Sequence, residues 1–171
     1  MISIDPATTA EDYAAFGALI RDYVAWLRVR CRDPPWFIDE VLGHQGLDRE
    51  LDQLAVAYGP PDGRVLLARR AGLVCGGGAY RRLSADACEM KRLFVPAQFR
   101  GHGTGRRLCD ALLAAAGTHG YRVMRLDSAR HLAEAIALYR AAGFRDCAPY
   151  AIVLPRLLPQ MVFMERSLQP G

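Results

Sequence analysis

Apolar residues in the first third of the chain follow the period of an α-helix. Between residues 11 and 30 they recur at steps of three and four, which places on one helix face Tyr13, Phe16, Ile20, Tyr23 and Leu27. Thr8 and Glu11 have the spacing of a capping box, which predicts the start of this helix. The two prolines of RDPPW end it, and residues 37–54 predict a second helix, interrupted or split near Gly43 and Gly46.

The rest of the chain alternates between short apolar runs and turn residues, which is typical of strands. GPPDG (59–63) predicts a turn, and the strands are predicted at 2–4, 64–70, 73–83, 87–95, 122–128, 148–154 and 161–168. Two further helices are predicted, from about Gly103 to His119 and from about Leu132 to Ala142. This order of strand, helices, meander and two helix–strand alternations predicts a mixed α/β sheet.

Composition narrows the class of protein. The 171 residues are 51% hydrophobic and 23% charged, which suits one globular domain over residues 1–171. No apolar run reaches the roughly 18 residues of a membrane helix, and the acidic N-terminus lacks the pattern of a signal peptide. The five cysteines form no C-x-x-C pair, so we expect reduced thiols in a cytoplasmic protein.

Charge and histidine spacing argue against two kinds of partner. The net charge is +4, without the long stripe of basic and aromatic residues that nucleic-acid binding needs, so we expect no nucleic acid. His44, His119 and His131 match no metal-ligand spacing, and we expect no metal. The modest positive charge leaves room for a small polyanionic ligand.

The stretch RGHGTG (100–105) places three glycines directly before a predicted helix, with Arg106 and Arg107 next to them. A helix N-terminus presents unpaired N–H groups and the positive end of the helix dipole, so it can bind an anion. Glycines would let a phosphate approach those groups closely. A tight strand-to-helix turn is the alternative explanation for the glycines, although three at alternate positions favour phosphate binding.

Two common phosphate motifs do not fit this loop. The P-loop lysine is missing, and an arginine stands where the last glycine of a dinucleotide fingerprint belongs. Asp127 could mimic the ribose-binding acid of a dinucleotide site, but the PAQF loop and the upstream meander fit such a unit poorly.

The sequence resembles the GNAT superfamily of acyl-CoA N-acyltransferases. Its motif [Arg/Gln]-x-x-Gly-x-[Gly/Ala] is matched by Arg100, Gly103 and Gly105, and CEMKRLFVPAQF resembles the preceding strand and loop. EAIALYRAAGF resembles the family's late helix, with Tyr139 before Gly143-Phe144. The resemblance implies a twisted, mostly antiparallel sheet of about seven strands flanked by about four helices.

The resemblance also implies how the donor binds. Acetyl-CoA would lie where two strands splay, with its pantetheine arm bonded to the backbone of Leu93, Phe94 and Val95. The pyrophosphate would lie on the loop and the helix start, formed by Arg100, Gly101, His102, Gly103, Thr104, Gly105 and Arg106. Many members carry an asparagine seven residues before the tyrosine, where this chain has Leu132. The segment 148–160 would line the acceptor side.

Direct attack of an amine on the thioester requires that two protons be managed. Tyr139, with an ordinary pKa of about 10, is the expected acid for the CoA thiolate, although it could instead pack on a helix face. Glu89 is the candidate base, and strand alternation without a bulge would place it on one face with Lys91, Leu93 and Val95. An ion pair with Lys91 is the alternative role for Glu89. A backbone N–H near Phe94 would stabilise the carbonyl oxygen.

These observations predict an acetyl-CoA-dependent N-acetyltransferase that acts on a small amine or a peptide amine. A non-catalytic acyl-CoA sensor with the same fold is the main alternative, and a nicotinamide-binding protein is a more distant one. Exposed strand edges in the C-terminal region make a homodimer plausible.

Overall fold

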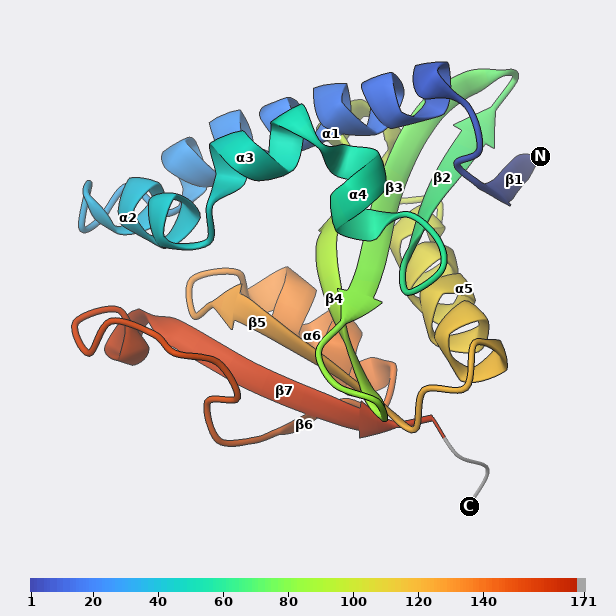
Figure 1. Cartoon of the computed structure of the whole chain (residues 1–171). Coiled ribbons are helices and arrows are strands. Elements are labelled where there is room, and N and C mark those ends of the chain that lie inside the picture. Colours follow the sequence, from blue (N-terminus) through green and yellow to red (C-terminus); the bar gives the residue numbers. More distant parts are fainter. Residues whose placement is uncertain (169–171) are drawn as a thin grey trace.

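The computed structural model describes residues 1–168, and within them one sheet of seven strands has the order β1-β2-β3-β4-β5-β7-β6. The strands are β1 (Ile2–Pro6), β2 (Arg64–Arg70), β3 (Leu73–Arg82), β4 (Ala87–Phe94), β5 (Val123–Ala129), β6 (Arg145–Asp146) and β7 (Met161–Ser167). Every neighbouring pair is antiparallel except β4 and β5, which run parallel. The predicted mostly antiparallel, mixed α/β sheet is therefore confirmed (Figure 1).

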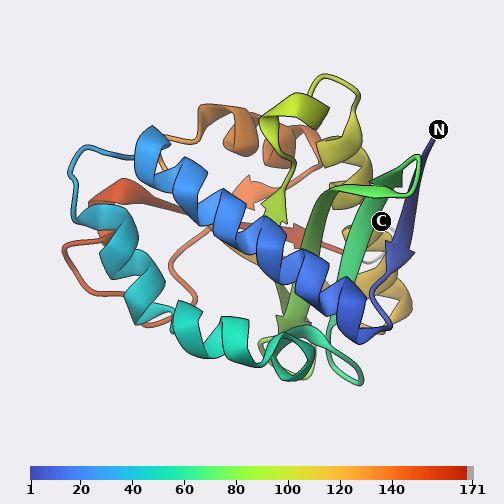
Figure 2. The same ribbon diagram turned by 90° about the horizontal axis from the view of Figure 1, so that it is seen from above.

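Helices cover both faces of this sheet (Figures 1 and 2). The described residues form six α-helices: α1 (Ala10–Arg30), α2 (Phe37–His44), α3 (Leu47–Asp52), α4 (Leu54–Tyr58), α5 (Thr104–Thr118) and α6 (Ala133–Ala141). The first four pack on one face, and α5 packs on the other face against β1 to β4. The count exceeds the predicted four for two reasons. The helix expected over 37–54 is split at Gly46, as anticipated near that residue, where φ is 72°. A second break at Gln53 separates the short helix α4 from α3.

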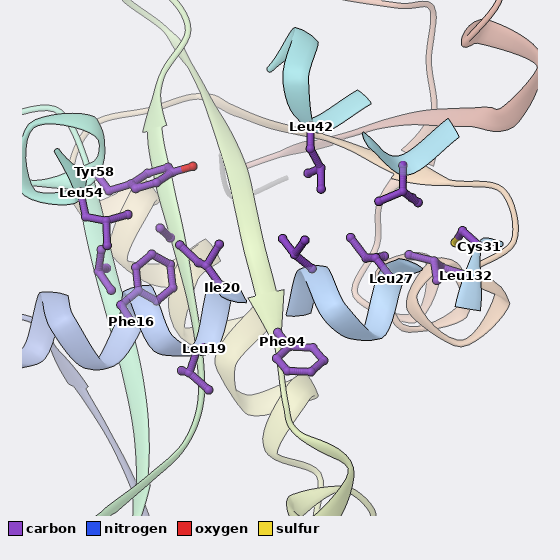
Figure 3. Packing of buried hydrophobic residues seen from close by; sticks show 14 of the residues in the cluster. Phe16, Leu19, Ile20, Leu27, Cys31, Leu42, Leu54, Tyr58, Phe94 and Leu132 are labelled. Atoms are coloured by element: carbon purple, nitrogen blue, oxygen red, sulfur yellow. The ribbon is translucent and has the colours of Figure 1, made fainter. Parts of the chain in front are cut away.

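Two apolar clusters hold these layers together. The first lies between the sheet and α1 to α4, and Figure 3 shows its centre around Phe16, Ile20, Leu27, Tyr58 and Phe94. The second lies between the sheet and α5, and it includes Leu108, Leu112, Met124, Leu126 and Met164. Burial against the sheet thus explains why apolar residues recur every three or four positions in the helices.

Two local predictions were wrong by small margins. The capping box of α1 is formed by Thr9 and Asp12 rather than Thr8 and Glu11, and Asp12 also pairs with Arg69 of β2. The segment 148–154 is not a strand. Pro149 lies within it and Pro155 directly follows it, and neither can donate to a strand ladder. The carbonyl oxygen of Ile152 instead lies 2.9 Å from His44 Nε2 of α2.

The parallel pairing between β4 and β5 is short, and the sheet opens where this pairing ends. Its register contains three pairs, of which Glu89 with Arg125 is the last. Beyond that pair the two strands separate, and the sheet carries a notch on the side that faces α1 and α2. A splay between these two strands was predicted, and it positions the site described below.

A β-bulge in β4 at this notch changes the face of the sheet to which the following side chains point. Lys91 pairs with Ala79 and Phe94 pairs with Gly77, so Arg92 and Leu93 together oppose Gly78. Arg92 has a φ of 59°, which is uncommon for a residue with a side chain. A Cβ on Gly78 would lie 2.9 Å from Leu112 Cδ1 and 3.2 Å from Leu93 Cδ1, so glycine makes room for the bulge.

The bulge separates residues that were expected to share one face of β4. Glu89 and Lys91 lie on the α1–α4 side, but Leu93 and Val95 pack with the α5 cluster, while Phe94 joins the α1 cluster. Alternation without a bulge would have kept Leu93 and Val95 beside Lys91.

No helix among residues 1–168 combines the length and the apolar character that a membrane crossing requires.

Candidate functional site

A cavity of about 580 Å³ lies at the notch between β4 and β5. Its wall is built from β4, the glycine loop, β5 and α6 on one side, and from α1 and α2 on the other. The cavity brings together most of the predicted donor residues, namely Leu93, Phe94, Val95, Arg100, Gly101, Gly103, Thr104, Gly105, Arg106 and Tyr139. His102 is exposed and does not belong to the wall, and neither does Glu89.

The glycine loop turns the chain from β4 into α5. Gly101 and Gly103 have φ of 83° and 72°, which favour glycine over any residue with a Cβ. Gly103 is the N-cap of α5 and makes no side-chain capping bond, so the N–H groups of the first turn have no capping side chain. With the positive end of the helix dipole, these groups suit an anion.

Thr104 supplies a second, independent sign of a ligand at this turn. The residue is 2% exposed and lines the cavity, yet its Oγ1 has no hydrogen-bond partner among residues 1–168. A buried hydroxyl without a partner is costly, and a bound acceptor would relieve that cost. The residues at the start of α5 therefore fit the pyrophosphate of a coenzyme A.

The three arginines of this region are held by other parts of the protein. Arg100 donates from Nε to the Val95 carbonyl at 2.8 Å, and its guanidinium lies 4.7 Å from the centre of the Trp26 ring. Arg106 forms an ion pair with Asp110, and Arg107 donates to the carbonyl oxygen of Ile2. The backbone rather than these guanidinium groups is what the loop offers to an anion.

Tyr139 is placed on α6 with its side chain in the cavity wall. Its ring packs edge-on against Phe144, with ring centres 5.9 Å apart. Burial raises the pKa of the Tyr139 hydroxyl well above its ordinary value, and the charges of neighbouring groups, including Asp127, add to the rise. The hydroxyl is therefore protonated at neutral pH and has a proton to donate. The packing that was the alternative role is present in this contact, whereas the role of Tyr139 as the acid stays a prediction.

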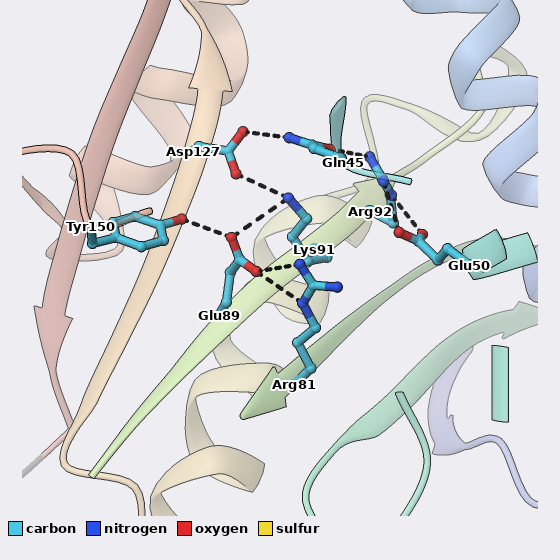
Figure 4. Close-up of polar contacts among 8 residues, drawn as sticks. All are labelled: Gln45, Glu50, Arg81, Glu89, Lys91, Arg92, Asp127 and Tyr150. Carbon is cyan, nitrogen blue, oxygen red and sulfur yellow. Dashed lines mark hydrogen bonds and ion pairs between the residues drawn. The ribbon is translucent and has the colours of Figure 1, made fainter. Parts of the chain in front are cut away.

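Glu89 is buried and surrounded by donors (Figure 4). Its Oε2 accepts from Arg81 Nε at 3.0 Å, and its Oε1 accepts from the Tyr150 hydroxyl at 3.0 Å. The predicted ion pair with Lys91 is present at 3.6 Å, although Arg81 is the closer cation. Burial raises the pKa of Tyr150 far above its ordinary range, so the tyrosine remains a donor to the carboxylate.

The same network continues from Lys91 into the cavity wall (Figure 4). Lys91 Nζ lies 3.0 Å from Asp127 Oδ1, and Gln45 donates to Asp127 Oδ2 at 3.1 Å. Burial alone would raise the pKa of Asp127, but the adjacent Lys91 outweighs it and lowers that pKa overall. Beyond Gln45, Arg92 forms a two-pronged ion pair with Glu50 at 2.8 and 2.9 Å.

Sequence reasoning missed most of the cavity wall outside the glycine loop and β4. The wall opposite the glycine loop comes from α1 and α2, and its apolar members include Leu27, Phe37, Ile38, Val41 and Leu42. None of residues 148–160 belongs to the wall of this cavity, so the acceptor-side role of that segment stays a prediction. The apolar pairs 37–38 and 41–42 share one helix face, and the GGG run in β3 marks the bulge, so signals for both were present.

Comparisons with known proteins agree with this geometry. The family model described as "Acetyltransferase (GNAT) domain" matches residues 61–146. An uncharacterised N-acetyltransferase of Schizosaccharomyces pombe is 30% identical over 98% of this chain and 95% of its own length. An IAA acetyltransferase of Azospirillum brasilense is 38% identical over 63% of this chain and 70% of its own length.

A solved structure with a similar fold contains the ligand in question. The PaiA N-acetyltransferase of Thermoplasma acidophilum, in complex with coenzyme A, superposes with a TM-score of 0.70. The two chains are 17% identical, and the match covers 98% of this chain and 99% of the other.

Proposed function

This chain belongs to the GNAT family of acetyltransferases, and we propose from that premise that it transfers an acetyl group from acetyl-CoA to a primary amine. The transfer takes place by direct attack within a ternary complex. The observation that carries the proposal is that one cavity joins the uncapped start of α5, the splayed end of β4 and the side chain of Tyr139. Relatives named as acetyltransferases favour an enzyme over a non-catalytic sensor.

Donor binding in this proposal uses the backbone more than side chains. The pyrophosphate lies against the first turn of α5 and accepts from Thr104 Oγ1, which otherwise has no partner in the described chain. The pantetheine arm lies along residues 93–95. The bulge turns Phe94 toward the α1 side, which is the side on which an acceptor enters.

Chemistry follows from the placement of Tyr139. The amine nitrogen attacks the thioester carbonyl carbon, a C–N bond forms, and the C–S bond breaks with its electron pair leaving on sulfur. The Tyr139 hydroxyl donates a proton to that thiolate, and the amine nitrogen loses one proton to solvent. The tyrosinate then regains a proton from solvent, so the reaction is balanced. A backbone N–H near Phe94 stabilises the carbonyl oxygen. The role of Glu89 as a base acting through water stays a prediction.

Thiol release from acetyl-CoA, measured against a panel of amines, tests the proposed function. We expect release that depends on the amine and saturates with it, and an acetylated amine by mass spectrometry. If acetyl-CoA raises the melting temperature but no amine supports release, the sensor explanation replaces the enzyme. If NADH stabilises the protein and acetyl-CoA does not, the donor assignment is wrong.

Replacing Thr104 with valine tests the donor site itself. A hydrogen bond to a charged group contributes about 1.5–3 kcal/mol, so the Kd for acetyl-CoA should rise about tenfold or more. The free protein should not lose stability, because the hydroxyl has no partner to lose among residues 1–168. Thermal melting with and without acetyl-CoA measures both effects.

Thr118→Val is the matched control for this variant. Thr118 is exposed at the opposite end of α5, so acetyl-CoA should stabilise that variant as it does the original protein. If Thr104→Val binds acetyl-CoA with unchanged affinity, the pyrophosphate does not bind at this turn.

A further inference from the structure

Two carboxylates line the cavity, and they differ in position. Glu134 lies at the rim, with 74% of its side chain exposed, and pairs with Arg30 at 2.6 Å. Asp127 lies inside, with 13% of its side chain exposed. The other two carboxylates of the buried network, Glu50 and Glu89, do not reach the wall. Among the described residues, Asp127 is therefore the carboxylate that lines the interior of the cavity.

The position of Asp127 is fixed by the topology of the sheet. The β4–β5 pairing ends at Glu89 and Arg125, so Lys91 and Asp127 are the next residues on that face, where the strands part. Residues 93–95, along which the pantetheine arm is proposed to lie, and Asp127 line the same cavity. The charge of Asp127 also contributes to the raised pKa of Tyr139, which places the carboxylate within electrostatic reach of the proposed acid.

The side chain of Asp127 is held by two hydrogen bonds and can accept more. Each of its oxygens accepts one hydrogen bond within the network, from Lys91 at 3.0 Å and from Gln45 at 3.1 Å. A carboxylate offers about four lone-pair positions, so both oxygens retain capacity toward the cavity. Burial raises the pKa of Asp127, but the charge of Lys91 outweighs it and lowers that pKa overall, so the carboxylate is ionised at neutral pH.

Outside this charged network, the cavity wall is mainly apolar. The acceptor wall presents Leu27, Phe37, Ile38, Val41 and Leu42 of α1 and α2, together with Leu132 and Met161. Three cations of the network, Arg81, Lys91 and Arg92, are balanced by the three carboxylates Glu50, Glu89 and Asp127. Such a wall suits an apolar body more than a second charge.

We propose that Asp127 is a catalytic residue that binds the acceptor nitrogen, and that the acceptor is a primary amine on an apolar or aromatic body. This inference rests on the proposed acetyl transfer. The amine donates an N–H to Asp127, which orients its lone pair toward the thioester. As the C–N bond forms, the nitrogen becomes positively charged, and the fixed carboxylate stabilises that charge. The proton then leaves the nitrogen for solvent while Tyr139 protonates the sulfur.

The first experiment compares amines on the unmodified protein. Phenethylamine, ethanolamine, phenylalanine and spermidine vary the body of the amine and its extra charges. We expect kcat/KM for phenethylamine to exceed that for ethanolamine about 10- to 100-fold, as burial of a phenyl group predicts. Preference for spermidine or phenylalanine would overturn the substrate class.

The second experiment replaces the carboxylate by Asp127→Asn and uses Glu165→Gln as its control. Glu165 is an ion-paired carboxylate on the neighbouring strand β7, outside the cavity. We expect Asp127→Asn to lower kcat/KM for phenethylamine about 100-fold or more, as loss of a preorganised charge predicts. Glu165→Gln should change kcat/KM less than threefold, in line with an exposed pair.

Stabilisation by acetyl-CoA separates the possible failures. Asp127→Asn should keep the full rise in melting temperature with acetyl-CoA, which shows that the donor site is folded. A variant that binds acetyl-CoA and retains its activity overturns the role of Asp127 while the proposed function stands. Absence of acetylation of every amine by the unmodified protein overturns the proposed function itself. If the variant does not fold, the amine preference of the unmodified protein still decides the substrate class.

Discussion

Replacement of Tyr139 by phenylalanine is expected to lower kcat about 100-fold or more while leaving acetyl-CoA binding nearly unchanged. The ring and its edge-on contact with Phe144 are kept, so the wall of the cavity keeps its shape. Only the hydroxyl is removed, and with it the proton for the leaving thiolate. Loss of a general acid typically costs 10²- to 10⁴-fold in rate. Steady-state thiol release gives kcat, and acetyl-CoA-dependent melting gives binding.

The pH dependence of the original enzyme gives an independent check on Tyr139. Burial raises the pKa of this hydroxyl well above 10, so its proton is retained throughout an assay between pH 6 and 9. Activity should therefore rise with pH as the amine loses its proton, with no decline from the tyrosine in that range. Tyr13→Phe, on α1 outside the cavity wall, is the matched control and should keep full activity. Full activity of Tyr139→Phe would assign the thiolate proton to another donor.

Replacement of Arg92 by methionine is expected to produce the largest loss of stability, about 3–5 kcal/mol. Arg92 and Glu50 are both nearly buried, with side chains 5% and 4% exposed. Without the guanidinium, the Glu50 carboxylate stays buried without its main partner. For a chain of this size the melting temperature should fall by about 10 °C. Urea unfolding measures the free energy directly.

Two further variants make this result specific. The double variant Glu50→Leu with Arg92→Met removes both charges and should recover much of the loss, because no buried ion remains unpaired. Arg28→Met removes an exposed pair with Asp39 and should change stability by less than about 1 kcal/mol. If Arg92→Met is no less stable than Arg28→Met, the ion pair does not hold this part of the fold.

Acid should narrow the difference between the original protein and Arg92→Met. Burial raises the pKa of Glu50, but hydrogen bonds from Arg92 outweigh it and lower the pKa overall. Stability from this pair is therefore complete above the unfolded pKa near 4.5 and is lost as pH falls through the lower folded value. In the variant, burial without the cation favours the protonated form. The difference in unfolding free energy should be largest at neutral pH and smaller below about pH 4.5.

Local patterns in the sequence were sufficient for most elements of this fold. The period of α1, the glycines before α5 and the apolar runs of β2, β3 and β4 each reflect one neighbouring layer, so a short window contains the signal. The segment 148–154 failed for the opposite reason. Its apolar residues resemble a strand, but its flanking prolines and its contact with α2 leave it outside the sheet.

The part of the candidate site that could be predicted is the side formed by the glycine loop and β4. Gly101, Gly103 and Thr104 are adjacent in sequence, so a local motif revealed them. Asp127 and Gln45 are 82 positions apart and meet only because α2 folds over the notch between β4 and β5. The bulge at Arg92 depends on room made by Gly78 on another strand. Such pairings over long distances cannot be derived from alternation within one strand.

Because Trp26 contacts Arg100, tryptophan fluorescence can be used to follow donor binding. The chain contains two tryptophans, and Trp26 lies in the cavity wall with a guanidinium 4.7 Å from its ring centre. Trp36 lies on the surface, 43% exposed, beside Arg156. In a Trp36→Phe background, intrinsic fluorescence would come from Trp26 alone. Acetyl-CoA entering beside Arg100 would then change the emission, so donor binding could be followed in real time without a label or an acceptor.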